Sequence, residues 1–133
     1  MAKDLKQTPL YSWHKEHGGQ MIEFAGWEMP VAYERGILEE HLSTRKFGGL
    51  FDISHMGRFL IHGEDALPFL QYVLTNNALA LDLGMAQYSL IQNETGGAID
   101  DAYLYRLEKG DPSLGGNYLL VVNAANKEKD WDW

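Results

Sequence analysis

Two adjacent carboxylates, Asp100 and Asp101, are the residues of this sequence best suited to chemistry. They lie in residues 98–107, whose composition predicts a β-strand. Because side chains alternate between the two faces of a strand, Asp101 shares a face with Tyr103 and Tyr105, and Asp100 faces the other way. A lone carboxylate is costly on an apolar face unless it is paired, protonated or hydrogen-bonded. Asp101 is therefore either a solvated residue at the end of a hairpin or a functional carboxylate, and both interpretations remain open.

Two further predicted strands, residues 85–92 and 118–123, could surround this carboxylate with aromatic side chains. If the faces of the three strands coincide, they bring together Tyr88, Asp101, Tyr103, Tyr105, Val121 and Asn123. Such an arrangement would form an aromatic-walled pocket with few polar groups, which suits a flat heteroaromatic ligand. The alternative is that the tyrosines simply cover a face against which a helix packs.

The histidines and the absence of cysteine argue against a metal site. His14 and His17 are three residues apart on a predicted helix, but no third ligand is evident, so we expect a solvated surface there. Asp52, Ser54 and His55 are close in sequence, yet strand geometry would not align them for nucleophilic catalysis, and a hydrogen-bonded turn is the better interpretation. The chain has no cysteine, which excludes disulfides and thiolate ligands.

The elements that must position these residues begin with a mixed segment. We expect a helix capped by Thr8, with Pro9 at its first position, and ended by the glycines at 18 and 19. A strand over residues 21–25 follows, and residues 26–30 are expected to be irregular because of the proline at position 30. Residues 34–46 predict a helix with one apolar face, which carries Ile37, Leu38, His41 and Leu42.

The second half predicts the order β-α-β-β-β-α. Its elements are a strand at 58–62, an amphipathic helix at 64–74, strands at 85–92, 98–107 and 118–123, and a helix from residue 124 onward. A turn at 93–97 joins the second and third of these strands, and residues 109–117 form a loop rich in turn residues. The fold class is therefore α+β, with a ferredoxin-like unit after about residue 55.

The composition argues against nucleic acid and membranes as partners. The formal net charge is −8 and no run of lysine or arginine occurs, so we expect no nucleic-acid binding. The sequence shows no signal peptide and no apolar stretch of the ~18 residues that a membrane span needs, so we expect a cytoplasmic protein without membrane contact. The chain ends inside a predicted helix with tryptophans at 131 and 133, and we expect it to be part of a longer protein.

Several segments, in the same order and with similar spacing, resemble the glycine cleavage T-protein family of aminomethyltransferases. They are TPL at 8–10, FAGWEMP at 24–30, FDISHMG at 51–57, NETGGAIDD at 93–101 and VNAAN at 122–126. The second and third strings are specific to the family, whereas the paired aspartates with their preceding glycines occur more widely in the superfamily. The resemblance covers essentially the whole chain.

The resemblance implies a fold, a reaction and a set of site residues. Residues 1–54 would be the first segment of a discontinuous domain, and residues 55–133 a second, ferredoxin-like domain, with later domains absent. The family transfers a one-carbon unit from the aminomethyl-lipoyl arm of H-protein to tetrahydrofolate and releases ammonia, with no metal. Its key acidic residue matches Asp101. Its folate-lining positions match Met56, Tyr88, Tyr103, Tyr105, Val121 and Asn123.

Two other assignments within the superfamily remain alternatives. One is a demethylase or the folate domain of a dehydrogenase, although the chain has no GxGxxG motif of the flavin-binding type. The other is a non-enzymatic folate-binding protein that supports iron–sulfur assembly. Because the family members are two to three times longer by resemblance, we expect this chain alone to have little or no activity.

Overall fold

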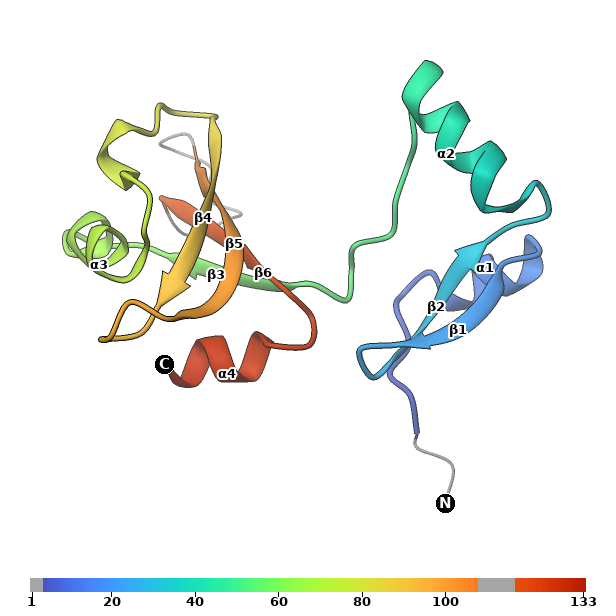
Figure 1. The fold of residues 1–133 in the computed structure, drawn as a ribbon, viewed down its shortest axis with the longest axis horizontal. Coiled ribbons are helices and arrows are strands. Elements are labelled where there is room, and N and C mark those ends of the chain that lie inside the picture. Colours follow the sequence, from blue (N-terminus) through green and yellow to red (C-terminus); the bar gives the residue numbers. More distant parts are fainter. Residues whose placement is uncertain (1–3, 108–116) are drawn as a thin grey trace. The chain divides into compact units, whose positions relative to one another are not determined.

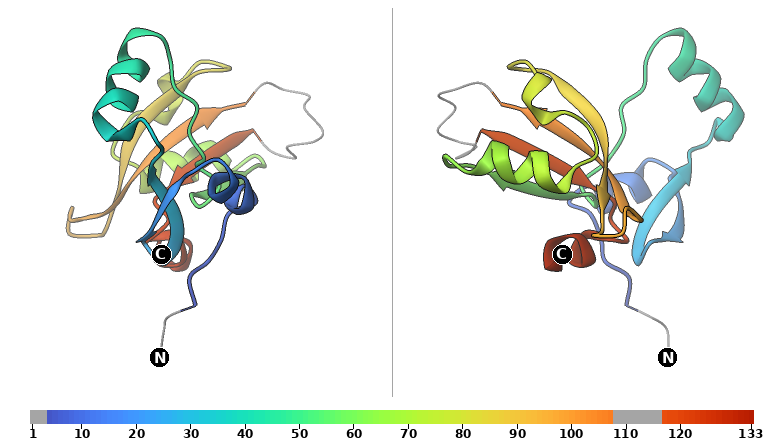
Figure 2. Two further views of the ribbon diagram at one scale, coloured as in Figure 1. Left: turned by 90° about the vertical axis from the view of Figure 1, so that its right-hand side faces the viewer. Right: turned by 60° about the vertical axis from the view of Figure 1, so that its left-hand side comes forward.

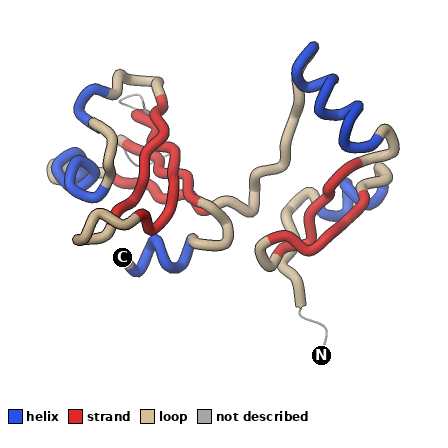
Figure 3. The backbone as a smooth tube through the Cα atoms, viewed as in Figure 1, coloured by secondary structure: helices blue, strands red, loops and turns tan. Residues whose placement is uncertain are grey.

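The structure, a computed structural model, describes residues 4–107 and 117–133. The chain divides into two compact units, Met1–His55 and Met56–Trp133, here called the N-terminal and C-terminal units. Each unit has its own antiparallel sheet (Figures 1 and 3). Of the predicted loop at 109–117, only Asn117 belongs to the described residues. Over those ranges, none of the helices has the length and apolar character that crossing a bilayer requires.

The N-terminal unit is built around a two-stranded hairpin. Its elements are α1 (Tyr11–Glu16), β1 (Gln20–Phe24), β2 (Trp27–Ala32) and α2 (Gly36–Lys46). Ala25 and Gly26, with φ of 52° and 80°, form the two-residue turn between the strands. Positive φ at both positions is the signature of a type I′ turn, whose twist matches that of the flanking strands.

Two predictions for the N-terminal unit are wrong. Residues 26–30 are largely a strand, and Pro30 lies in β2 opposite Met21, next to a bulge. A proline is tolerated there because each strand of a two-stranded sheet has one free edge. Thr8 does not cap α1, which begins three residues later at Tyr11 and has no side-chain cap. Thr8 is buried instead, and its hydroxyl has no hydrogen-bond partner among the described residues.

Helix α2 forms where it is predicted, but its apolar face is not buried. Ile37, Leu38 and Leu42 are 64%, 72% and 44% exposed, and no residue of α2 is buried. After the helix, Gly48 adopts a φ of 150°, a conformation that glycine tolerates best. The pattern therefore predicted the helix correctly but not its surroundings.

The C-terminal unit confirms the predicted order of elements. They are β3 (Gly57–Ile61), α3 (Ala66–Val73), the short 3-10 helix η1 (Ala78–Ala80), β4 (Ala86–Gln92), β5 (Ala98–Arg106), β6 (Tyr118–Val122) and α4 (Lys127–Asp132). The sheet order is β3-β6-β5-β4, and every neighbouring pair is antiparallel. Figure 2 shows α3 lying across one face of this sheet.

One hydrophobic cluster holds α3 against the sheet. Leu70, Leu104 and Val122 are fully buried at its centre. The cluster consists of Ala66, Leu70, Leu74, Ala78, Leu81, Ile91, Ala102, Leu104, Tyr118, Leu120 and Val122. The predicted faces of the helix and of β5 and β6 are thus confirmed, because alternate strand residues and one helical stripe meet in a single core. The opposite face of the sheet is left for other contacts.

Candidate functional site

The face of the four-stranded sheet opposite α3, here called the open face, carries three tyrosines side by side. Tyr103 on β5 lies opposite Tyr88 on β4 and Val121 on β6. The Tyr88 and Tyr103 ring centroids are 5.7 Å apart at an interplanar angle of 68°, and those of Tyr103 and Tyr105 are 6.4 Å apart. These rings are between 39% and 50% exposed. Among the residues that the structure describes, no helix buries these tyrosines.

Asp101 is exposed and lies at one end of this row of rings. Its Oδ1 atom accepts a hydrogen bond of 2.9 Å from Asn123 Nδ2, at the end of β6. Desolvation and the nearby charge of Asp101 raise the pKa of Tyr88. The structure thus brings together Asp101, Asn123 and the tyrosines, as the alternation predicts, on a surface that solvent can reach.

Met56 lies at the same end of the sheet. It directly precedes β3, whose first residue Gly57 pairs with Val122 on β6, and it is half-buried. The residues matched to the folate-lining positions therefore include one just outside the sheet. Their part in binding remains a prediction.

Asp100, the first member of the acidic pair, points into the core face and is 7% exposed. Its carboxylate accepts hydrogen bonds from the backbone N–H of Asn123 at 3.3 Å, from Asn123 Nδ2 at 3.0 Å and from Asn126 Nδ2 at 2.8 Å. Burial alone would raise the pKa of Asp100, but hydrogen bonds from Asn123, Asn126 and Asp130 outweigh it and lower that pKa. The Asn123 side-chain amide therefore joins the two aspartates across the sheet.

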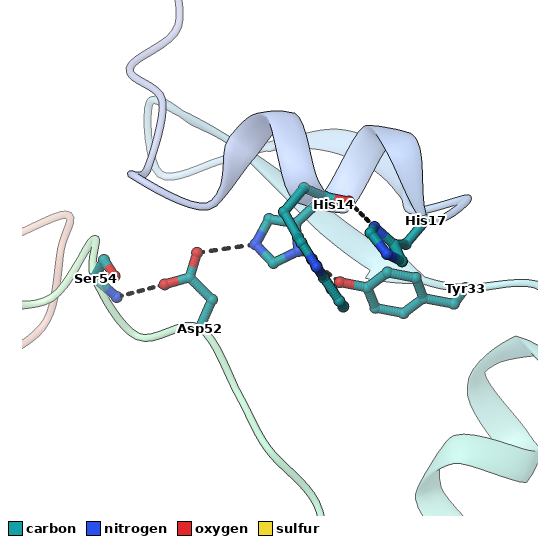
Figure 4. Close-up of polar contacts among 6 residues, drawn as sticks. His14, His17, Tyr33, Asp52 and Ser54 are labelled. Carbon is teal, nitrogen blue, oxygen red and sulfur yellow. Dashed lines mark hydrogen bonds and ion pairs between the residues drawn. The ribbon is translucent and has the colours of Figure 1, made fainter.

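A second polar cluster lies within the N-terminal unit and involves His14. Its Nε2 atom is 2.9 Å from Asp52 Oδ2, and its Nδ1 atom is 2.6 Å from the Tyr33 hydroxyl (Figure 4). Asp52 Oδ1 also accepts the backbone N–H of Ser54 at 2.9 Å. The side chains of His14 and Asp52 are 5% and 3% exposed. This network ties α1, the end of β2 and the segment after α2 to one another.

The charges in this cluster set the direction of its hydrogen bonds. Burial would raise the pKa of Asp52, but hydrogen bonds from His14 and Ser54 hold it far below its ordinary value, so the group is a carboxylate. Burial and the charges of Glu40 and Asp52 raise the pKa of Tyr33, which keeps its proton. His14 Nε2 therefore donates to the Asp52 carboxylate. The Tyr33 hydroxyl can donate to His14 Nδ1 or accept from it, depending on the tautomer of the imidazole.

The structure corrects one histidine prediction and confirms a turn. His14 is buried rather than solvated, whereas His17 is exposed and stacks on Trp13 with ring centroids 4.0 Å apart. The predicted hydrogen-bonded turn forms through Asp52 and Ser54. The histidine partner of Asp52 is His14, 38 residues away, and not the neighbouring His55.

Sequence reasoning gave Asp100 no role in the site and missed Asn126 and Asp130. The first could have been found, because the alternation that places Asp101 on the open face places Asp100 beside Ala102 and Leu104 in the core. The others come from α4 and the residue before it, whose docking on the sheet no local pattern predicts. His14 and Asp52 were missed as a pair because their contact is long-range.

Comparison with known proteins gives consistent matches over nearly the whole chain. Residues 10–133 match the family model described as the GCVT N-terminal domain. An aminomethyltransferase of Thermus thermophilus is 51% identical over 126 residues, which cover 95% of this chain and 34% of that protein. The aminomethyltransferase of Symbiobacterium thermophilum is 47% identical over 133 residues, which cover 100% of this chain and 34% of that protein.

A solved structure shares the fold. The crystal structure of glycine cleavage system aminomethyltransferase T from Bartonella henselae matches with a TM-score of 0.85 and 42% sequence identity. The match covers 97% of this chain and 34% of that one. This chain therefore spans about a third of the length of the relatives that it matches.

Proposed function

The chain belongs to the aminomethyltransferase family, and from that premise we propose that it forms part of a folate-dependent aminomethyltransferase. In this proposal a polypeptide containing the chain transfers a one-carbon unit from the aminomethyl-lipoyl arm of H-protein to tetrahydrofolate. Ammonia and the dihydrolipoyl carrier are released. The chain covers 34% of the length of its relatives, so it would form one wall of the site rather than the whole site.

The observation that carries the proposal is the pairing of a carboxylate with half-exposed rings on the open face. Tyr88, Tyr103 and Tyr105 present flat apolar surface on which a reduced pterin can pack. Asp101 and Asn123 supply an acceptor and an amide at the edge of that surface. A few placed polar groups beside an apolar surface are what a heteroaromatic ligand needs for orientation.

Asp101 would act mainly by stabilising positive charge that develops during the reaction. When an aminomethyl thioether loses ammonia and a folate nitrogen attacks its carbon, positive charge develops on the carbon–nitrogen unit. A carboxylate fixed beside that unit stabilises the charge, and it can also accept a proton from the attacking nitrogen. The hydrogen bond from Asn123 fixes the position of the Asp101 carboxylate before the substrates arrive.

The test replaces Asp101 by asparagine in a chimera in which this chain substitutes for the matching third of the Thermus aminomethyltransferase. Asp101→Asn keeps the shape and removes the charge, so we expect ammonia release with lipoylated carrier and tetrahydrofolate to fall by about 10²–10³-fold. Asp82→Asn, at an exposed position of the same unit, is the matched control and should leave the rate unchanged. Near-normal turnover of the Asp101 variant would overturn the proposed role.

Titration with tetrahydrofolate distinguishes an aminomethyltransferase from a protein that only binds folate. The 133-residue chain is titrated while the Tyr88 and Tyr103 ring resonances are followed by NMR, and perturbation of both rings is expected. A chimera that binds the folate but releases no ammonia from the aminomethylated carrier would instead support the demethylase or iron–sulfur alternatives. Absence of any effect on the rings would remove the open face from the site.

A further inference from the structure

The contact between β5 and α4 contains two carboxyl groups. Asn126 links Asp100 on β5 to Asp130 on α4: its Nδ2 atom donates to Asp100 at 2.8 Å, and its carbonyl accepts the backbone N–H of Asp130 at 2.8 Å. The two carboxyl groups are close enough for the charge of Asp100 to act on Asp130. Both carboxyl oxygens of Asp130 are buried, and no donor among the described residues reaches them. Two buried carboxylates in contact repel each other unless one of them carries a proton. The contact therefore requires a shared proton.

The surroundings of the pair place that proton on Asp130. Burial, the hydrogen bond with Asp100 and the charge of Asp100 raise the pKa of Asp130 to about 7, and the charge of Lys129 opposes them. Asp100 already accepts hydrogen bonds from Asn123 and Asn126, which stabilise its ionised form. Asp130 is thus the donor and Asp100 the acceptor.

The other charged groups near the pair are engaged elsewhere or lie at its margin. The Lys129 ammonium donates to the Ile99 carbonyl at 2.7 Å, and the stem of Lys127 packs over Gly57 at the start of β3. Asp101 lies on the opposite face of β5, and Tyr88 on β4 is within the electrostatic range of Asp100. At the end of β6 the pair meets the neutral amide of Asn123. None of these groups donates a hydrogen bond to the carboxyl oxygens of Asp130.

We propose that Asp100 and Asp130 are positioning residues, and that the proton they share holds the Asn123 amide in the orientation that fixes Asp101. Asn123 Nδ2 lies 3.0 Å from Asp100 Oδ1, 2.9 Å from Asp101 Oδ1 and 3.3 Å from the Asp101 carbonyl oxygen. Loss of the proton places two like charges at the base of α4, next to Asn126, whose amide also holds Asp100. The role in catalysis rests on the proposed function of Asp101, whereas the shared proton does not.

The first experiment tests the proton alone. In the 133-residue chain, the side-chain amide resonances of Asn123 and Asn126 are followed by NMR from about pH 5 to about pH 9. We expect a single transition with a midpoint of about 7. Asp130→Asn places a permanent donor against Asp100 and should abolish the transition. Asp132→Asn, an exposed carboxylate on the same helix, should retain it.

Each outcome of this experiment is decisive. A wild-type chain without a transition overturns the inference, even if the Asp130 variant does not fold. A transition that persists in Asp130→Asn also overturns it, because the titrating group must then lie elsewhere.

The second experiment asks whether the proton matters to the reaction. In the chimera we expect the transfer rate to fall about tenfold from about pH 6 to about pH 8, through loss of one proton. Asp130→Asn should remove this alkaline fall, and Asp130→Ala should lower the rate throughout the range. An alkaline fall that is unchanged in Asp130→Asn excludes the positioning role. Failure of the proposed function is recognised separately, by near-normal turnover of Asp101→Asn.

Discussion

The two units of this chain are stabilised by different means. Among the described residues, the buried hydrophobic positions of the N-terminal unit are Met29 and Ala32, whereas the C-terminal unit contains the cluster of eleven around Leu70 and Leu104. In place of a core, the N-terminal unit has the network of His14, Tyr33 and Asp52. Apolar burial therefore specifies the C-terminal unit, and directed hydrogen bonds specify the N-terminal unit.

The exposed surfaces reflect the same difference. In and just after α2, the N-terminal unit exposes a run of large apolar side chains. These are Ile37, Leu38, Leu42, Phe47, Leu50, Phe51 and Ile53. In the C-terminal unit, α3 places its buried residues against the sheet and forms the predicted layer. An amphipathic pattern therefore specifies a helix but not the partner that covers it.

The largest expected effect comes from the core. Leu104→Ala removes a fully buried side chain, and we expect the free energy of unfolding of the C-terminal unit to fall by about 3–5 kcal/mol. Amide hydrogen exchange should accelerate at Ala102 and Leu120 and stay unchanged at Ile22 and Met29. The exposed Leu83→Ala is the control. Equal acceleration in both units would show that they share one cooperative core.

A smaller effect is expected from the polar network. His14→Ala leaves the Asp52 carboxylate buried without its imidazole partner, so the N-terminal unit should lose about 2–3 kcal/mol. His17→Ala, three residues further along and exposed, should have little effect. Hydrogen exchange at Ile22 and Met29 measures the change. Unchanged exchange in the β1–β2 hairpin would contradict the claim that this hydrogen-bond network stabilises the N-terminal unit.

The same variant has a distinct pH signature. Since the pKa of Asp52 is depressed in the folded state, its contribution to stability is present above the ordinary value of 3.8 and is lost as the pH falls below it. Acid should therefore loosen the wild-type hairpin below about pH 4. In His14→Ala this acid dependence should be weaker, because the largest hydrogen bond that lowers the Asp52 pKa is gone.

The smallest effect is expected at the hairpin turn. Ala25 is the one described non-glycine residue with a positive φ, and Asn tolerates that conformation better than Ala. Ala25→Asn should raise the free energy of unfolding of the N-terminal unit by about 0.5–1 kcal/mol, and Ala25→Val should lower it by about 1 kcal/mol. Denaturant unfolding followed at the Trp27 resonance measures both variants. The opposite order of stability would rule out the type I′ assignment.

Local patterns predicted most of the fold of the C-terminal unit. The alternation in β5 and β6 and the apolar stripe of α3 repeat with the periods of their elements, and each period points to the same core. The strand that contains Pro30 was missed because a proline is disfavoured in a sheet interior, and only the pairing with β1 shows that β2 is an edge. The exposed face of α2 was likewise invisible to a pattern that records amphipathicity alone.

The candidate site divides in the same way. The residues of the open face, including Tyr88, Asp101 and Tyr103, could be grouped from alternation, because the three strands are neighbours in sequence and pair in order. Asp130 could not be linked to Asp100, and His14 could not be linked to Asp52, because each contact joins elements that no local rule brings together. Local sequence patterns therefore did not predict these long-range polar contacts.

The bulge that precedes the acidic pair has a consequence for how the sequence can vary. Pairing between β4 and β5 is offset at Ile91 and Gln92, which lie opposite Asp100 and Ala98. That offset determines which face of the sheet each later residue of β5 points to. Inserting or deleting one residue there would exchange the inward and outward side chains. Asp100 would then meet solvent, and Asp101 would be driven into the hydrophobic interior. Substitutions in the connecting turn should consequently be tolerated far more readily than a change of its length by a single residue.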